Sequence, residues 1–405
     1  MTVQSETAAP ITRESLASGI AKTAFAFRGY NQKNLGKTPE LLEHPVYGST
    51  VEKYLTLGSE ICSEVMDLNV DLVARVRSRV EPTLQEYHEA ITMVSAVELA
   101  QIEILKSVFD VSLNDADMMY GFSLGELTAL VAGGVLTMKD SLSIPLQMSR
   151  DAALLAEDVT LAIVFSRSDK LIPRENVNRL CADINREGKG VIGVSAFLAP
   201  NSMLMMGQGD TIQRFKDRKD EITEERVSVR LNEGKWPPLH TPIVWQKNIT
   251  NRSQFLMHTI ESGLSPPSIP LLSLATGEFS YDGVNTRKVV GKWIDQPQLL
   301  WEAVDTTLLR GEETIIHVGP EPNIIPATFS RLATNVQLQT KDRMGMKTLS
   351  TIARQGWLSA ILPKRANLLR APHIRHVILE DWLLAQDEGG GNSGDVAAGD
   401  ETKQV

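Results

Sequence analysis

The 405-residue sequence has little cysteine, few aromatic residues and no long apolar run. Its two cysteines, Cys62 and Cys181, exclude a disulfide framework, and neither has neighbours at a metal-ligand spacing, so we expect no metal site. Residues 1–20 lack the apolar segment that a secretory signal needs, and no later run reaches the roughly 18 apolar residues of a membrane span. We therefore expect a cytoplasmic protein without a membrane span.

An excess of positive charge is also missing, because the formal net charge is -9. Nucleic-acid binding requires a concentrated field of Lys and Arg, so we expect no nucleic-acid partner. The hydrophobic fraction of 42% and the charged fraction of 22% are typical of a globular protein. A chain of this length exceeds what one hydrophobic core usually holds, which predicts a large domain that carries a smaller one.

Periodicity divides the chain into these parts. Residues 1–20 lack it and are predicted to be a mobile arm, and the Gly-, Asp- and Ser-rich residues 386–405 a disordered acidic tail. Short apolar strands and helical stretches alternate between them, which predicts an α/β core with a parallel sheet over residues 21–157 and 236–385. Residues 158–235 are predicted to form a smaller α+β insert. The clearest helix is predicted for residues 83–109.

One segment has the pattern of a nucleophile turn. A predicted strand at residues 115–120 is followed by Gly121-Phe122-Ser123-Leu124-Gly125 and by a predicted helix at residues 124–135. Such a strand, sharp turn and helix present the serine hydroxyl outward and aim the N–H of Leu124 at a developing oxyanion. The alternative is a chance match in which Ser123 only caps the helix.

Residues 121–136, Gly-Phe-Ser-Leu-Gly-Glu-Leu-Thr-Ala-Leu-Val-Ala-Gly-Gly-Val-Leu, resemble the G-H-S-x-G-E signature of the malonyl-CoA:acyl carrier protein transacylase family, which includes polyketide synthase acyltransferase domains. Further segments resemble that family in the same order, at residues 24–31, 147–150, 239–243, 289–301 and 317–322. The resemblance implies an α/β fold, with an α/β-hydrolase-like core and an inserted ferredoxin-like subdomain. It also implies an acyl-enzyme on Ser123.

The same resemblance assigns the partners of Ser123. His240, in Leu-His-Thr-Pro, becomes the general base, a role that suits the usual pKa of histidine, and the carbonyl of Lys292 becomes its orienting acceptor. Tyr30 supplies the second oxyanion N–H. Arg150, buried opposite Ser123, binds the carboxylate of a malonyl group. The alternatives are a structural histidine beside prolines and, for Arg150, a surface ion pair with Asp151 or Glu157.

Tyr30 stands where the family usually has Gln, which leaves its backbone role intact. Phe122, Leu239 and Leu198 also depart from the family pattern, and we expect them to shape the acyl pocket. The implied reaction moves malonyl from malonyl-CoA to the phosphopantetheine thiol of an acyl carrier protein, without a bound cofactor, beside other components of fatty acid or polyketide synthesis. A carrier dock is predicted at one of two basic sets: Lys364, Arg365, Arg370 and Arg375, or Arg214, Lys216, Arg218 and Lys219. A serine acyl hydrolase of the thioesterase kind and a catalytically weak partner-binding homologue remain open.

Overall fold

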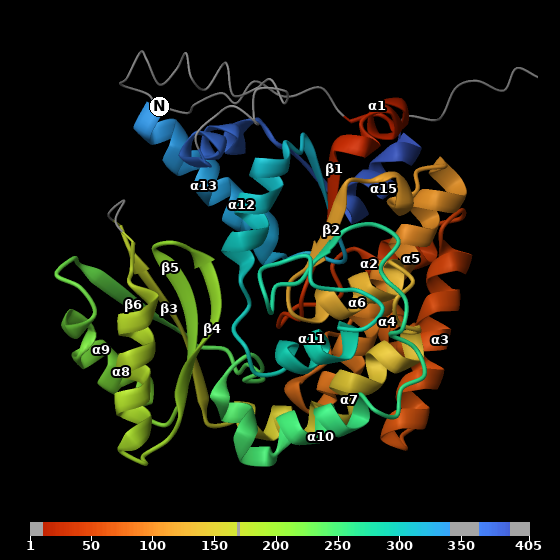
Figure 1. Ribbon diagram of the computed structural model, residues 1–405. Helices are drawn as coiled ribbons and strands as arrows, with labels where there is room; N and C mark the ends of the chain where they lie inside the picture. Colours follow the sequence, from red (N-terminus) through yellow and green to blue (C-terminus); the bar gives the residue numbers. More distant parts are fainter. Residues whose placement is uncertain (1–10, 168–170, 341–363, 389–405) are drawn as a thin grey trace, which may run out of the picture.

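The computed structural model describes residues 11–167, 171–340 and 364–388 and contains two sheets (Figure 1). The larger sheet is parallel throughout, with the strand order β7-β2-β1-β8-β9. Its strands are β1 (Thr23–Phe27), β2 (Met118–Gly121), β7 (Leu271–Leu272), β8 (Thr314–Val318) and β9 (Arg375–Ile378). The predicted parallel sheet of the core is therefore present.

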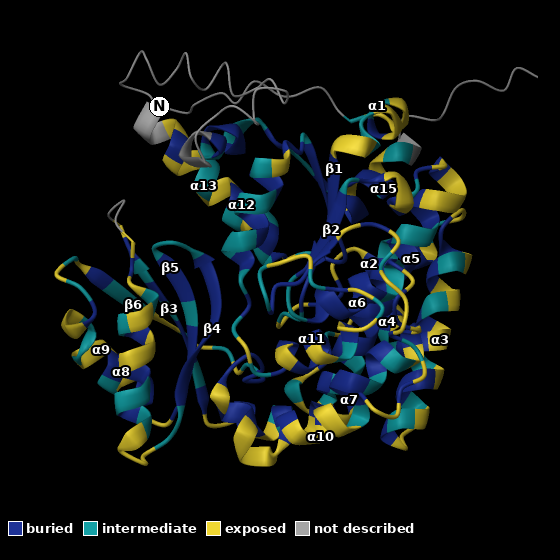
Figure 2. Cartoon of the chain, viewed as in Figure 1, coloured by how far each residue is buried: buried dark blue, intermediate teal, exposed yellow. Residues whose placement is uncertain are grey.

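Helices cover both faces of this sheet, and β1 shows why. Phe25 and Phe27 belong to a core cluster that also holds residues of α3 (Gly48–Met66), α5 (Tyr87–Phe109) and α7 (Met138–Ala156). Ala24 and Ala26 belong to a second cluster with residues of α12 (Leu300–Arg310) and α13 (Ile324–Thr340). Because successive strand residues point to opposite faces, one continuous apolar run serves both layers. Figure 2 shows the sheet as a buried centre.

The smaller sheet is antiparallel and lies to the left in Figure 1. Its strands are β3 (Val159–Ser166), β4 (Ile192–Ala199), β5 (Ser202–Gln208) and β6 (Val227–Asn232), in the order β4-β5-β3-β6. Two helices, α8 (Arg174–Arg186) and α9 (Thr211–Asp217), pack on it through a separate apolar cluster. All four strands fall inside the predicted insert, whose limits at 158 and 235 stay a prediction.

The ends of the described chain are more ordered than predicted. Residues Arg13–Ser18 form α1, in which Leu16 is buried, so the predicted mobile arm does not extend over residues 13–20. Helix α15 (Leu379–Glu388) continues through the first residues of the predicted tail. The remainder of both predictions, residues 1–10 and 389–405, lies outside the described residues.

Further helices complete the larger unit: α2 (Thr38–Glu43), α4 (Leu72–Ser78), α6 (Leu124–Ala132), α10 (Ile249–Leu256) and α11 (Thr286–Trp293). Short 3-10 segments include η2 (Leu84–Glu86) and η5 (Pro242–Lys247). None of the helices in the described ranges combines the length and the apolar character that crossing a membrane requires.

Candidate active site

Ser123 lies at a sharp turn between β2 and α6. Its backbone has φ 54° and ψ -117°, a conformation that costs energy for a residue with a side chain and that clusters at functional sites. Its hydroxyl does not cap the helix, since it contacts His240 instead. The cap alternative is therefore wrong, and the strand, turn and helix match the predicted arrangement.

The glycines on either side of Ser123 are required by close backbone packing. A Cβ atom on Gly121 would lie 2.1 Å from the carbonyl carbon of Gly125. A Cβ atom on Gly125 would lie 2.4 Å from the carbonyl oxygens of Phe27 and Arg28, at the end of β1. These contacts press the N-terminus of α6 against the ends of the central strands, where parallel sheets bind their ligands.

The Oγ atom of Ser123 lies 2.7 Å from Nε2 of His240, so the structure brings the predicted nucleophile and base together. His240 has φ 65°, and its backbone N–H donates to the carbonyl of Ile294 at 2.8 Å. The imidazole is buried, at 5% exposure. This burial lowers the pKa of His240 to about 4, and the hydrogen bond to the carbonyl of Trp293 opposes the effect. The ring is neutral at pH 7.

The acceptor that orients His240 is the carbonyl of Trp293, 2.6 Å from Nδ1. A carbonyl oxygen cannot donate, so this contact places a hydrogen on Nδ1 and leaves the Nε2 lone pair facing the serine hydroxyl. The prediction of Lys292 is wrong by one residue: Lys292 is exposed, and α11 turns the next carbonyl toward the imidazole. The predicted type of acceptor, a backbone carbonyl, is present.

The side chain of Trp293 also belongs to the site, which sequence reasoning missed. Its indole Nε1 donates to the carbonyl of Ser123 at 2.8 Å, and its ring meets that of His240 edge to face at 5.2 Å. Trp293 is 1% exposed. One residue therefore contacts the nucleophile through its side chain and the base through its backbone.

Gln298 is a second residue that sequence reasoning missed. Its Oε1 accepts the backbone N–H of Ser123 at 3.0 Å, and its Nε2 lies 3.3 Å from Nδ1 of His240. The side chain is completely buried. No motif signal identified it, because its contacts with Ser123 and His240 are tertiary.

The predicted oxyanion donors are Leu124 and Tyr30. The N–H of Leu124 begins α6, where helical N–H groups have no intrahelical acceptor. Gly29 precedes Tyr30 and lies against the turn, since a Cβ atom on it would be 3.2 Å from Cβ of Ser123. Within residues 11–167, 171–340 and 364–388, neither N–H has a hydrogen-bond acceptor. Leu124 and Tyr30 therefore remain predicted oxyanion donors, each with a free N–H group near the turn that carries Ser123.

Arg28 fixes the loop that carries Tyr30. Its buried guanidinium donates to the carbonyls of Gly29 at 2.7 Å, of Pro320 at 2.5 Å and of Lys33 at 3.3 Å, and to Oδ1 of Asn34 at 2.9 Å. Burial lowers the pKa of Arg28, and the nearby carboxyl groups of Glu98 and Glu321 act in the opposite direction. Arg28 is therefore a positioning residue for the predicted oxyanion loop.

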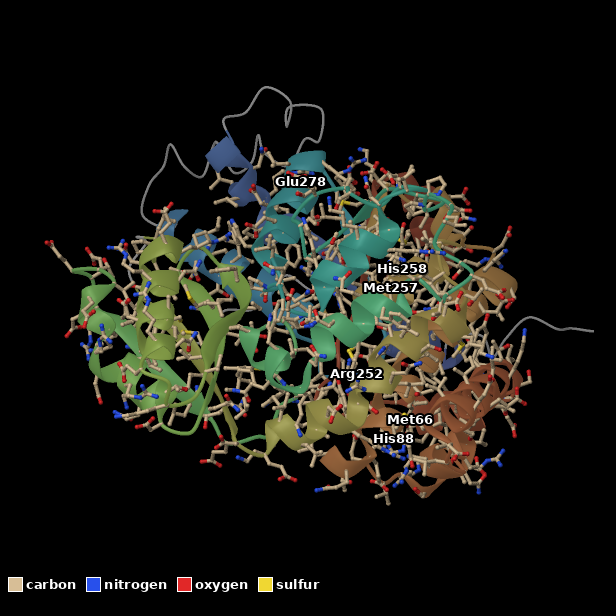
Figure 3. The ribbon with its side chains drawn as sticks, turned by 60° about the horizontal axis from the view of Figure 1, so that its bottom comes forward. Met66, His88, Arg252, Met257, His258 and Glu278 are labelled. Carbon is tan, nitrogen blue, oxygen red and sulfur yellow. The ribbon has the colours of Figure 1, made fainter. Side chains whose placement is uncertain are left out.

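Arg150 is not buried, which corrects its predicted position. It is an exposed residue of α7, and its Nη2 reaches the carbonyl of Met66 at 3.5 Å. Two positions along a helix differ by about 200° around its axis, so Arg150 and the residue two before it point in nearly opposite directions. That residue, Met148, is 2% exposed. The buried face of α7 therefore carries Met148, and Arg150 faces solvent. Figure 3 shows Met66 and His88 on the face turned forward.

The alternative predicted for Arg150, an ion pair with Asp151 or Glu157, is also absent within the described part of the chain. Asp151 pairs instead with Arg252, labelled in Figure 3. The positive charge of Arg150 instead acts on His88. Burial lowers the pKa of His88, and Arg150 acts in the same direction. Arg150 thus belongs to the surface around the C-terminal end of α3.

The predicted acyl-pocket residues divide between two clusters. Leu198 belongs to the cluster on the α12 side of the sheet, and Phe122 packs against the same cluster. Leu239 is buried in the other cluster, with its carbonyl 3.5 Å from Oγ of Ser195. These three residues remain predicted pocket residues, with Phe122 and Leu198 on a common apolar surface.

Four of the eight basic residues predicted to dock a carrier protein are engaged by other groups within the described part of the chain. Arg370 is 4% exposed and donates to the carbonyls of Leu308 and Gly311, so it is a structural residue. The side chains of residues 364–366 lie outside the described residues. In the other set three members form ion pairs with neighbouring acids, namely Arg214, Arg218 and Lys219.

The fold resembles those of solved acyl carrier protein malonyltransferases. The structure resembles an acyl carrier protein S-malonyltransferase from Vibrio cholerae with a TM-score of 0.60 and 19% identity, covering 76% of this chain and 92% of that one. It resembles the MCAT of Streptococcus pneumoniae with a TM-score of 0.60 and 18% identity, at the same coverage. The chain therefore has the fold of malonyl-CoA:acyl carrier protein transacylases, as its motifs indicated.

The curated relatives are much longer proteins. The polyketide synthase GfsA of Streptomyces halstedii is 21% identical over 323 residues, which are 76% of this chain and 4% of that protein. The mycoketide-CoA synthase of Mycobacterium tuberculosis is 21% identical over 349 residues, 85% of this chain and 8% of that protein. The chain thus spans less than a tenth of these relatives. No family profile matches it.

Proposed function

We propose that this chain transfers an acyl group, with malonyl as the first candidate, from a coenzyme A thioester to the phosphopantetheine thiol of an acyl carrier protein. The observation that carries the proposal is the contact of 2.7 Å between Oγ of Ser123 and Nε2 of His240, with Nδ1 held by a carbonyl. A hydroxyl with a correctly oriented neutral imidazole is the arrangement that nucleophilic acyl transfer needs.

In the first half-reaction, Nε2 of His240 takes the hydroxyl proton while Oγ of Ser123 bonds to the thioester carbonyl carbon. The carbonyl oxygen becomes an oxyanion, toward which the N–H groups of Leu124 and Tyr30 donate. The C–S bond then breaks, and the proton on Nε2 passes to the departing thiolate. The second half-reaction repeats these steps in reverse with the carrier thiol, which returns Ser123 to its hydroxyl form.

The acidity of the acceptor, rather than the strength of the base, favours a thiol over water in the second half-reaction. Its pKa of about 4 means that the neutral imidazole is always available near pH 7, but that it is a weak base. A thiol, with an ordinary pKa near 8.5, ionises far more readily than water, so it depends less on a strong base. This difference supports transfer over the alternative, hydrolysis.

Malonyl is the candidate acyl group because the names of the structural relatives specify malonyl transfer. An exposed guanidinium such as that of Arg150 contributes at most about 1 kcal/mol to a charged contact. We therefore propose only a modest preference for malonyl over acetyl, with Phe122, Leu198 and Leu239 as apolar lining of the acyl site. Malonyl-CoA is the substrate, and no cofactor takes part in any step.

An acyl carrier protein is the proposed partner, because one structural relative was solved as a malonyl-transacylase with a type II PKS acyl-carrier protein. Further synthase components are proposed from the polyketide synthase relatives, with the cytoplasm as the location. We also interpret the large unit as α/β-hydrolase-like, from its parallel sheet and nucleophile turn. The βαββαβ order of the insert supports a ferredoxin-like subdomain.

The test supplies radiolabelled malonyl-CoA to the protein, once with a holo acyl carrier protein and once without it. We expect label on the carrier and little free malonate, and no transfer by Ser123→Ala. Rapid release of malonate without a carrier would favour the hydrolase. Absence of both reactions in the folded protein would favour the non-catalytic homologue.

A further inference from the structure

We propose that Gln298 is a positioning residue whose neutral amide holds the nucleophile turn and occupies the place beside His240 that a triad carboxylate would need. This inference deepens the proposed function on which it rests. It concerns a residue within the segment 289–301 to which the family resemblance assigns no role.

The contacts of Gln298 fix the orientation of its amide. The N–H of Ser123 can only donate, so the atom at 3.0 Å from it is the amide oxygen, and the NH₂ group is turned toward the imidazole. This leaves Nε2 of Gln298 at 3.3 Å from Nδ1 of His240. Because Nδ1 gives its hydrogen to the carbonyl of Trp293, the two nitrogens are neighbours without a mutual hydrogen bond.

The backbone of Gln298 is anchored to the smaller sheet. The backbone N–H of Gln298 donates to the carbonyl of Ser195 at 2.8 Å, and its carbonyl accepts the N–H of Phe197 at 2.8 Å. These two hydrogen bonds attach Gln298 to strand β4 of the smaller sheet. The side chain is completely buried. A long side chain with a fixed backbone and a bonded amide oxygen has little freedom, so it can hold the strained backbone of Ser123.

The groups around the His240 ring are electrically neutral. The groups that face the ring are the Ser123 hydroxyl, the carbonyl and indole of Trp293, and the Gln298 amide, all neutral. Among the described residues no charged side chain affects its protonation. In contrast, a carboxylate at this distance from Nδ1 would stabilise the imidazolium and strengthen the base. The neutral amide keeps the base weak, which suits a thiol acceptor.

Gln298→Glu tests this inference, because glutamate can still accept the N–H of Ser123 but adds a charge beside His240. The probe is a fluorophosphonate, which labels an activated serine without any acyl-CoA, and the labelling rate is measured against pH. For Gln298→Glu we expect the midpoint of the acid limb to rise by about one pH unit or more. An unchanged midpoint in this folded variant would overturn the proposal.

Gln298→Leu provides the second variant, since it leaves the N–H of Ser123 without its acceptor. We expect labelling to slow about tenfold, corresponding to one lost buried hydrogen bond, with an unchanged midpoint. Labelling at the wild-type rate would contradict the positioning role. The matched control is Gln208→Glu, a buried glutamine that accepts the N–H of Val191 at 3.2 Å and pairs with Gln246.

The control should retain the wild-type midpoint, since a general effect of added charge would move it as well. Acyl loading from malonyl-CoA is measured in parallel. If the wild type fails to load while the fluorophosphonate midpoints behave as expected, the proposed function fails and the role of Gln298 stands. If loading succeeds and the midpoints do not move, the role of Gln298 fails alone.

Discussion

The surroundings of Ser123 and those of Arg150 differ in almost every physical respect. Around Ser123, the imidazole, the indole and the amide that contact it are buried, and backbone groups hold them in place. Arg150 lies on the surface and has one long contact to a carbonyl. The structure therefore constrains the proposed nucleophile and base much more tightly than it constrains the proposed contact to an acyl carboxylate.

Removal of the base should have the largest effect. His240→Ala is expected to slow loading of Ser123 about 10² to 10⁴-fold, since that is the usual contribution of a positioned base. In the wild type, His240 binds a proton only as the pH falls toward its pKa of about 4, so loading should persist well below pH 6.5. Stopped-flow loading against pH measures both effects. An acid limb centred near 6.5 would contradict the burial argument.

Disruption of the oxyanion loop should come next. Arg28→Met removes the guanidinium that bonds to Gly29, Lys33, Asn34 and Pro320, and it leaves buried acceptors unpaired. We expect the free energy of unfolding in urea to fall by about 3 kcal/mol. The matched control is Arg79→Met, an exposed arginine paired with Glu40 and Glu43, which should cost less than about 1 kcal/mol. Equal losses would contradict the assigned role of Arg28.

A smaller effect is expected from Trp293→Phe. The substitution keeps the carbonyl that orients His240 and removes the indole hydrogen bond to the carbonyl of Ser123. Loss of one buried hydrogen bond of about 1 kcal/mol should slow acyl loading about fivefold. Trp245→Phe, at a tryptophan that is 54% exposed, serves as the control and should load normally. Identical rates for the two variants would show that the indole contact has no role in positioning.

The smallest effect is expected at Arg150. Arg150→Ala should change the ratio of malonyl to acetyl loading less than about fivefold, because an exposed charge is screened by water. Competitive loading followed by mass spectrometry measures this ratio. A loss of malonyl loading beyond a hundredfold, with acetyl loading intact, would remove the contrast between the two regions. Arg252→Ala, an exposed arginine that pairs with Asp151, controls for general surface charge effects.

Much of the fold was predictable because local patterns and burial agree. The alternation of short apolar runs and helical stretches predicted the parallel sheet of the core and the α+β insert. Helical spacing predicted one helix over residues 83–109, of which α5 occupies Tyr87–Phe109 and the 3-10 segment η2 Leu84–Glu86. Strand β9 was missed, and the end of the chain was predicted to lose order from residue 386, although α15 continues to Glu388. The run Arg375–Ile378 is short and partly polar, and only its pairing with β8 makes it a strand.

Site residues that occupy motif positions could be predicted from the sequence. Site residues that are defined only by tertiary contacts could not. Ser123 and His240 occupy motif positions, and the structure brings them into contact. Lys292 was wrong because one residue of register decides which carbonyl faces the imidazole. Arg150 was misplaced because a separation of two residues on α7 reverses the face of the helix. Gln298 and Trp293 act through tertiary contacts that no local pattern encodes.

The most direct test of this account is the intact mass of the protein shortly after mixing with malonyl-CoA at neutral pH. The account predicts an adduct of one malonyl group, mapped to Ser123 by peptide sequencing, which disappears when a holo acyl carrier protein is added. The Ser123→Ala variant should show no adduct. An unmodified mass in the folded wild type, or an adduct that Ser123→Ala retains, would contradict the central claim.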